Sequence, residues 1–131
     1  MENPMNEDQL QAKCFRWFDE TFPAERKMLF AVPNGGERVS RKINGVWVNE
    51  GNKLKHMGVV PGVADMILVT DEVTFIEMKF GSGTQSQEQT KFMDRVRERG
   101  HDYRLIYSFE EFQKLIIKKI TQYEKRKGTD E

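Results

Sequence analysis

Two acidic residues and one lysine lie on neighbouring segments that are rich in β-forming residues. Asp65 lies near the start of the apolar segment 63–69, and Glu77 and Lys79 lie near the end of segment 73–79. Because side chains alternate between the two faces of a strand, Glu77 and Lys79 project from the same face. Charged groups inside a sheet are costly to bury without partners or a metal ion. Two carboxylates and an amine in this arrangement indicate a site for a hard, oxygen-preferring cation such as Mg²⁺.

The same residue types indicate a reaction. Asp65, Glu77 and the backbone carbonyl of Met78 offer oxygen ligands to the cation, which leaves positions open for water and a phosphate oxygen. Lys79 would orient the attacking water and stabilise the charge that develops on phosphorus. A simpler alternative stays open, because opposite charges two residues apart, such as Glu77 and Lys79, are common on exposed strands.

Glu7 and Gln89 are further candidates, and each has a structural alternative. Glu7 lies on the inward side of a predicted helix, where it could reach the metal directly or through water. It could equally complement the helix dipole. Gln89 and Ser86 have the spacing of a capping box at the start of a helix, yet the same helical face turns Gln89 toward the sheet. The residue types alone do not decide between these roles.

Basic residues that precede Asp65 could contact DNA phosphates, or they could form an ordinary solvated surface. They are Arg38, Arg41, Lys42, Lys53 and Lys55. Trp47 could stack on a base but is more simply explained by packing. His56 and His101 have no third ligand nearby in the sequence, so the pattern does not indicate a zinc site.

The elements that must position these residues follow from apolar spacing and turn signals. Residues 7–20 predict a helix capped by Asn6, and the Asn44–Gly45 pair predicts a hairpin turn. In chain order, the main predicted elements are helix 7–20, strands 28–33, 63–69 and 73–79, helix 86–99, strand 103–107 and a last helix after Ser108. This αβββαβα order predicts an α/β fold with a mixed sheet flanked by helices.

Composition limits the classes of protein. The chain has 131 residues, which predicts a single domain, 1–131, with a core at about 7–120 and a frayed tail from about 124. Its 21 basic and 21 acidic residues cancel, so the strong positive field of a non-specific DNA binder is missing. One cysteine excludes an internal disulfide. With no apolar run of about 20 residues and no signal-peptide pattern, we expect a cytoplasmic protein and no membrane contact.

Taken together, these segments resemble the VRR-NUC family of the PD-(D/E)XK nuclease superfamily. The segments that carry the resemblance are 7–11, 33–36, 58–65, 76–79 and 86–89. The resemblance implies a restriction-endonuclease-like fold and metal-dependent cleavage of DNA. It assigns Asp65, Glu77 and Lys79 to the catalytic centre, which Glu7 and Gln89 complete. Ala64 departs from the pattern, since the superfamily's name expects proline there.

The resemblance also implies a small stand-alone protein of a bacterium or phage that forms a homodimer and acts in DNA repair or recombination. We therefore expect a Mg²⁺- or Mn²⁺-dependent endonuclease that is selective for branched DNA, such as four-way junctions or flaps. The broad apolar face of the last predicted helix is a second reason to expect a dimer. The alternatives are a catalytically silent nucleic-acid-binding module with the same fold, and a small interaction protein whose carboxylates form only ion pairs.

Overall fold

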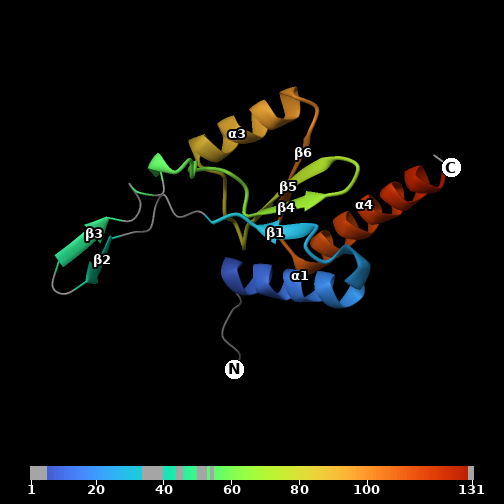
Figure 1. The fold of residues 1–131 in the computed structure, drawn as a ribbon, viewed down its shortest axis with the longest axis horizontal. Helices are drawn as coiled ribbons and strands as arrows, with labels where there is room; N and C mark the ends of the chain where they lie inside the picture. Colours follow the sequence, from blue (N-terminus) through green and yellow to red (C-terminus); the bar gives the residue numbers. More distant parts are fainter. Residues whose placement is uncertain (1–5, 34–39, 44–45, 50–52, 54, 130–131) are drawn as a thin grey trace.

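The computed structural model describes residues 6–33, 40–43, 46–49, 53 and 55–129 (Figure 1). Its elements, in chain order, are α1 (Glu7–Thr21), the short 3₁₀ helix η1 (Pro23–Glu25), β1 (Leu29–Ala31), β2 (Ser40–Ile43), β3 (Val46–Asn49), β4 (Met66–Val69), β5 (Val73–Met78), α3 (Gln87–Glu98), β6 (Asp102–Ile106) and α4 (Phe109–Thr129).

Four of these strands form one mixed sheet in the order β1-β4-β5-β6. β1, β4 and β5 pair antiparallel, and β6 joins β5 in parallel after the crossover through α3. β2 and β3 form a separate antiparallel hairpin, which projects away from the sheet in Figure 1. The predicted α/β class and element order are confirmed.

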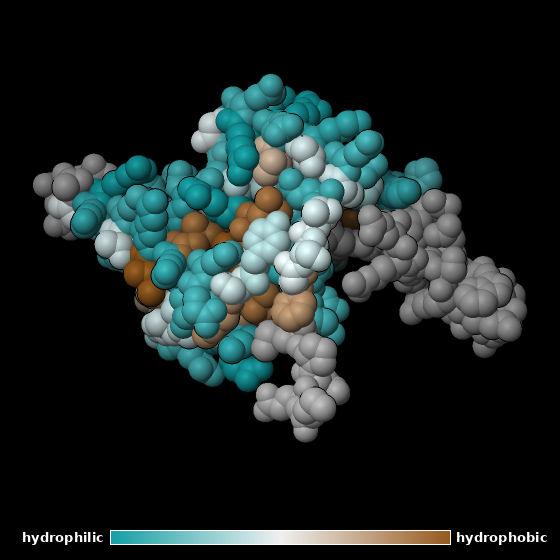
Figure 2. All heavy atoms as spheres, turned by 180° about the vertical axis from the view of Figure 1, so that it is seen from behind, coloured by the Kyte–Doolittle hydropathy of each residue, from teal (hydrophilic) through white to brown (hydrophobic). Residues whose placement is uncertain are grey.

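Helices cover both faces of this sheet. α1 and α4 pack on one face, over a core that includes Phe18, Ile76 and Phe112. α3 packs on the other face, where a smaller cluster forms around Tyr103 and Val96. Seen from behind, the surface is largely hydrophilic, with apolar atoms gathered near its middle (Figure 2). None of the helices in the described part of the chain is long and apolar enough to cross a membrane.

The sequence signals at the helix ends operate as predicted. Asn6 caps α1 and Ser86 caps α3, each in a reciprocal capping box with the glutamine three residues later. Gly100 follows α3 with a φ of 84°, which glycine adopts without strain. Two boundaries need correction. The strand expected at 63–69 begins only at Met66, and α4 continues to Thr129 instead of fraying from about Glu124.

An ion pair explains the longer last helix. Arg126, near the end of α4, pairs with Asp71 in the turn between β4 and β5. This contact ties the end of the helix to the sheet, although it joins residues far apart in the sequence. The predicted hairpin is present as the pairing of β2 with β3, while its turn at Asn44–Gly45 lies outside the described residues.

Candidate active site

Asp65 and Glu77 meet at one end of the sheet. Met66 lies opposite Ile76 in the β4–β5 register, and continuing that register by one residue places Asp65 opposite Glu77. The Met78 backbone N–H donates a hydrogen bond to Asp65 Oδ2 at 2.7 Å. The Val32 N–H donates to the Asp65 carbonyl oxygen at 2.8 Å. Asp65 is therefore held from both neighbouring strands, although it precedes β4 by one residue.

Glu77 is a buried carboxylate whose two oxygens differ in their surroundings. Its side chain is 1% exposed. The Tyr103 hydroxyl donates to Oε1 at 2.9 Å. Oε2 is one of two buried side-chain oxygens in the described residues that have no hydrogen bond, the other being Thr74 Oγ1. The nearest positive charge is Lys79 Nζ, 3.8 Å from Oε2, which makes an ion pair without a hydrogen bond.

Gln89 fills both of the roles that the sequence left open. Its Oε1 accepts the Ser86 backbone N–H at 2.9 Å, which closes the capping box of α3. The same oxygen accepts a hydrogen bond from Lys79 Nζ at 3.1 Å. The cap of α3 therefore fixes the position of the lysine amine, which is itself buried with its residue 8% exposed.

The pKa values of both carboxylates are raised. For Asp65, burial is the largest cause, and the nearby charges of Glu7 and Asp8 add to it. The Met78 N–H and Lys79 oppose the increase. Burial also raises the pKa of Glu77, against the Tyr103 hydrogen bond and the Lys79 charge. Since burial is the largest cause of both increases, the hydrogen bonds and positive charge of the protein do not offset the cost of burying these two carboxylates.

The N-terminus of α1 brings Glu7 and Asp8 to the same region. Glu7 is exposed, and its Oε1 would lie 3.7 Å from a Cβ placed on Gly83, which would also lie 3.6 Å from Lys79 Cδ. These distances place the loop after β5 close to both residues. Glu7 is near the site without belonging to its buried part, which agrees with a role through water.

A glycine in the loop before Asp65 sets the distance between that loop and α3. Gly62 has a φ of 87°, and a Cβ there would lie 2.9 Å from the backbone carbonyl carbon of Glu88. Both the left-handed backbone and the close contact require glycine. This packing places the first turn of α3, and with it Gln89, beside the approach to Asp65.

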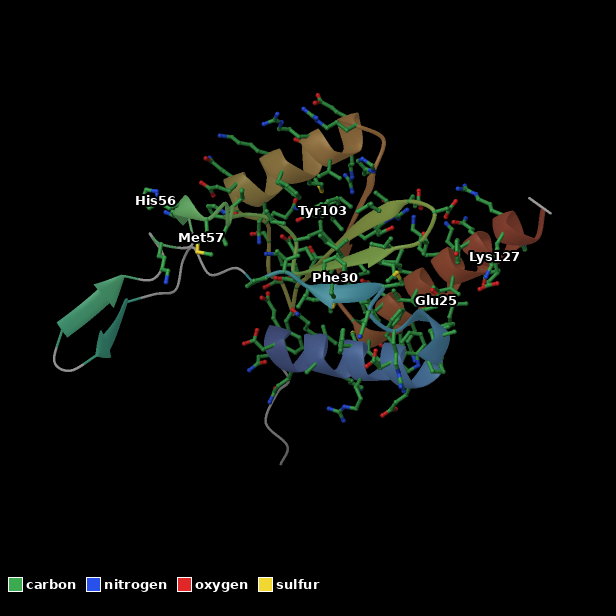
Figure 3. The ribbon with its side chains drawn as sticks, in the orientation of Figure 1. Glu25, Phe30, His56, Met57, Tyr103 and Lys127 are labelled. Atoms are coloured by element: carbon green, nitrogen blue, oxygen red, sulfur yellow. The ribbon has the colours of Figure 1, made fainter. Side chains whose placement is uncertain are left out.

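The structure describes only some of the predicted DNA-binding residues. Lys53 and Lys55 are exposed, at the start of the stretch that leads to Asp65. Arg41 and Lys42 lie in β2 with side chains outside the described set, and Arg38 lies outside the described residues entirely. His56 lies on the side of the molecule where β2 and β3 project, apart from Tyr103 (Figure 3).

Two residues at the site were not identified from the sequence. Tyr103 lies beside Phe75 in the parallel β5–β6 register, which puts it on the Glu77 face. The available signal was a tyrosine inside an apolar strand, since a buried hydroxyl needs a hydrogen-bond partner. Asp8 acts on the pKa of Asp65, and its only signal was its position next to Glu7.

The donor set suits a divalent cation. In the part of the chain that the structure describes, no group of three or more His, Cys, Asp or Glu side chains forms a metal-binding cluster. Two carboxylates do converge, however, and one buried oxygen of Glu77 has no hydrogen bond. Oxygen donors with excess negative charge are what Mg²⁺ and Mn²⁺ prefer. The residues therefore fit such an ion, with two carboxylates as its protein charges.

Comparison with known proteins places the fold. No family model matches the sequence, and no curated protein matches it. A solved structure described as "VRR_NUC domain protein" superimposes with a TM-score of 0.67, covering 92% of each chain at 17% identity. Another, described as "VRR_NUC domain", has a TM-score of 0.49 at 18% identity and covers 80% of this chain and 91% of that chain. The first likeness shows that this chain has the fold of that VRR_NUC domain protein, which confirms the expected resemblance at the level of fold.

Proposed function

We propose that this protein is a metal-dependent endonuclease that hydrolyses phosphodiester bonds in DNA. The observation that carries the proposal is the buried end of β5, where Glu77 Oε2 has no hydrogen bond and Lys79 Nζ lies 3.8 Å away. A buried carboxylate oxygen that accepts no hydrogen bond is costly for folding, and such perturbed groups cluster at functional sites. The VRR_NUC fold supports this reading by analogy.

Asp65, Glu77 and the Met78 carbonyl would hold Mg²⁺ or Mn²⁺, with Glu7 contributing through water. When bound, the cation would lower the pKa of a water molecule and neutralise charge on the phosphate. Tyr103 holds Glu77 in place through its hydrogen bond to Oε1, which leaves Oε2 for the ligand. The Met78 N–H fixes the position of Asp65 through its hydrogen bond to Oδ2.

Lys79 is the group that would act on the substrate. Gln89 accepts one of its three N–H donors, and Glu77 holds its charge from the other side. The remaining donors can orient the attacking water and stabilise the charge that develops on the phosphate oxygens. Because Gln89 is also the cap of α3, the lysine is positioned before substrate arrives, and little reorganisation is needed.

We further propose that the protein is a homodimer and that it prefers branched DNA. β6 is an edge strand, and a groove of about 310 Å³ between it and α4 is lined in part by Leu105, Ile106 and Leu115. Ile117 of α4 is 50% exposed. An edge strand beside apolar side chains is a natural surface for a second copy. Light scattering at micromolar concentration would test this, and a clean monomer would exclude the dimer.

Cleavage of three labelled DNAs tests the main proposal: a four-way junction, a flap and a plain duplex, each with Mg²⁺, Mn²⁺ or EDTA. We expect metal-dependent cutting of the branched substrates by the wild type. Lys79→Ala should lower the rate by about 10²–10³-fold, as the loss of a charge-stabilising donor does elsewhere. Lys125→Ala, an exposed lysine of α4, is the matched control. Binding without cutting in every condition would favour the silent nucleic-acid-binding module instead.

A further inference from the structure

A cleft of about 550 Å³ opens directly beside Asp65 and is not used by the mechanism above. One wall is a single face of α1, formed by Asp8, Gln11, Ala12 and Phe15 at helical spacing. The other wall consists of residues 30–33, from β1 and the residues that follow it. Figure 3 shows Phe30 on β1, next to α1. Since Asp65 lines the cleft, the cleft is continuous with the candidate active site.

Two aromatic residues in the cleft lining are exposed. Phe15 is 36% exposed and Phe30 is 43% exposed. A single exposed aromatic residue is unremarkable, but two in the lining of one concave site are typical of ligand-binding pockets. Ala12 and Ala31 also line the cleft, and their small side chains leave room in it.

The charges along the cleft restrict its occupant. Asp8 and Asp65 both line it, and none of the lysines and arginines that the structure describes does. A phosphate group would be repelled by Asp8, which holds no metal in the proposed mechanism, whereas a flat, uncharged group would stack on a phenylalanine ring. The amide of Gln11 is the uncharged polar group in the lining that could donate to and accept from such a ligand. Of the parts of a DNA strand, only the base has these properties.

We propose that the α1–β1 cleft binds one unpaired nucleobase next to the phosphodiester that is cleaved, stacked on the ring of Phe15 or of Phe30. This inference rests on the proposed nuclease function. A base inside a duplex must first be unstacked and unpaired to enter, whereas a base at a junction or flap is already free or easily freed. The cleft therefore gives a physical reason for selectivity toward branched DNA.

The test uses flap substrates that each carry one 2-aminopurine at successive positions around the branch point. Lys79→Ala serves as the parent protein, so that cutting does not interfere. We expect quenched fluorescence at one position, through stacking. The double substitution Phe15→Ala/Phe30→Ala should abolish this quenching and raise Kd about tenfold. Ala12→Trp, which fills the cleft without removing either ring, should do the same. Met28→Ala, which removes an exposed apolar side chain outside the cleft lining, is the matched control.

The outcomes separate this inference from the proposed function. Unchanged quenching and Kd in both cleft variants would overturn the nucleobase site, even if the wild type cuts DNA. Quenching that depends on Phe15 and Phe30 would support the site, even if the wild type cuts nothing. Equal quenching in a fully paired duplex would overturn the requirement for an unpaired base. Loss of self-association in the cleft variants, with quenching unchanged, would show that a second copy occupies the cleft instead.

Discussion

Each end of the sheet buries a cluster of carboxylates and a lysine, but the two clusters differ in how far protein groups satisfy these charges. At one end lies the site cluster of Asp65, Glu77, Lys79 and Gln89. At the other end, near the starts of β5 and β6, lies the Lys119 cluster of Glu72, Asp102, Arg104 and Lys119. Each cluster contains two carboxylates and a buried lysine. The pKa values of Asp65 and Glu77 are nevertheless raised, whereas that of Asp102 is lowered.

In the Lys119 cluster, protein groups satisfy one another. Lys119 Nζ lies 2.5 Å from Glu72 Oε1 and 2.6 Å from Asp102 Oδ2, and Arg104 Nε lies 3.0 Å from each Asp102 oxygen. Burial alone would raise the pKa of Asp102, but the hydrogen bonds from Lys119 and Arg104 hold it below its ordinary value. The hydrogen bonds to Asp102 and Glu72 raise the pKa of Lys119 against the effect of burial.

In the site cluster, burial dominates instead, and the pKa values of both carboxylates rise. Lys79 makes one ion pair at 3.8 Å and one hydrogen bond to a neutral amide. Desolvation is costly at both ends, but only the Lys119 cluster offsets it within the protein. The comparison separates a cluster whose charges are satisfied within the protein from one whose carboxylates are not.

The largest expected effect on stability comes from exchanging the two lysines for methionine. Lys119→Met leaves Glu72 and Asp102 without their shared cation, so we expect the free energy of unfolding to fall by about 3 kcal/mol. Lys79→Met breaks one ion pair at 3.8 Å and one hydrogen bond, and Glu77 can then take up a proton because its pKa is already raised. This variant should therefore lose less than about 1 kcal/mol, while cleavage is abolished. Urea denaturation of both variants measures this. Equal losses of stability would contradict the distinction between the two clusters.

A glycine substitution would show that backbone packing, more than ion pairing, positions the site cluster. Gly62→Ala forces a Cβ to 2.9 Å from the Glu88 backbone at a φ of 87°. We expect a loss of about 2 kcal/mol, together with reduced cleavage, because α3 and Gln89 must shift. Gly100→Ala is the matched control, since its φ is 84° and no atom lies within 4 Å of the added Cβ. Thermal unfolding and cleavage rates should show the larger loss at Gly62 in both quantities.

In the absence of metal, removing the buried charge of Glu77 should stabilise the protein. The folded-state pKa of Glu77 is raised. The contribution of Glu77 to the free energy of unfolding is therefore complete at low pH and is lost as the pH rises through the folded-state pKa. At neutral pH, Glu77→Gln should therefore raise the free energy of unfolding by about 1 kcal/mol and abolish cleavage. Thermal unfolding in EDTA measures this, with the exposed Glu98→Gln as control.

Metal addition completes that comparison. A Mg²⁺ concentration ten times Kd should stabilise the wild type by about 1.4 kcal/mol and Glu77→Gln by much less. Equal stabilisation of the two proteins by Mg²⁺ would show that Glu77 is not a ligand.

The sequence predicted the site cluster better than the Lys119 cluster, because the residues of the site cluster lie closer together in the sequence. Asp65, Glu77 and Lys79 lie on strands joined by a short turn, so local alternation and register are enough to bring them together. Gln89 follows from a capping signal that is equally local. The Glu72–Lys119 contact instead depends on how α4 packs on the sheet. Tyr103 contacts Glu77 because β6 pairs in parallel with β5, and α3 separates these two strands in the sequence. No short-range pattern encodes either arrangement, while the metal and the DNA contacts remain predictions.

A further modest effect concerns the stability of the protein at acid pH. Asp102 has a folded-state pKa below its ordinary value of 3.8, so the stability it contributes is present above that value and is lost as the pH falls through the folded-state pKa. Asp102→Asn should therefore lower the free energy of unfolding by about 1 kcal/mol at neutral pH, a modest effect because Asp102 and Arg104 are partly exposed. The difference between the two proteins should then narrow below about pH 4, where the wild-type carboxyl also becomes neutral. Urea denaturation from pH 7 to pH 3 measures this, and Asp94→Asn, on the exposed face of α3, serves as the control. A difference that is constant across this range would mean that Asp102 contributes through shape and neutral hydrogen bonds, and the electrostatic contrast between the two ends of the sheet would then rest on Lys119 and Glu72 alone.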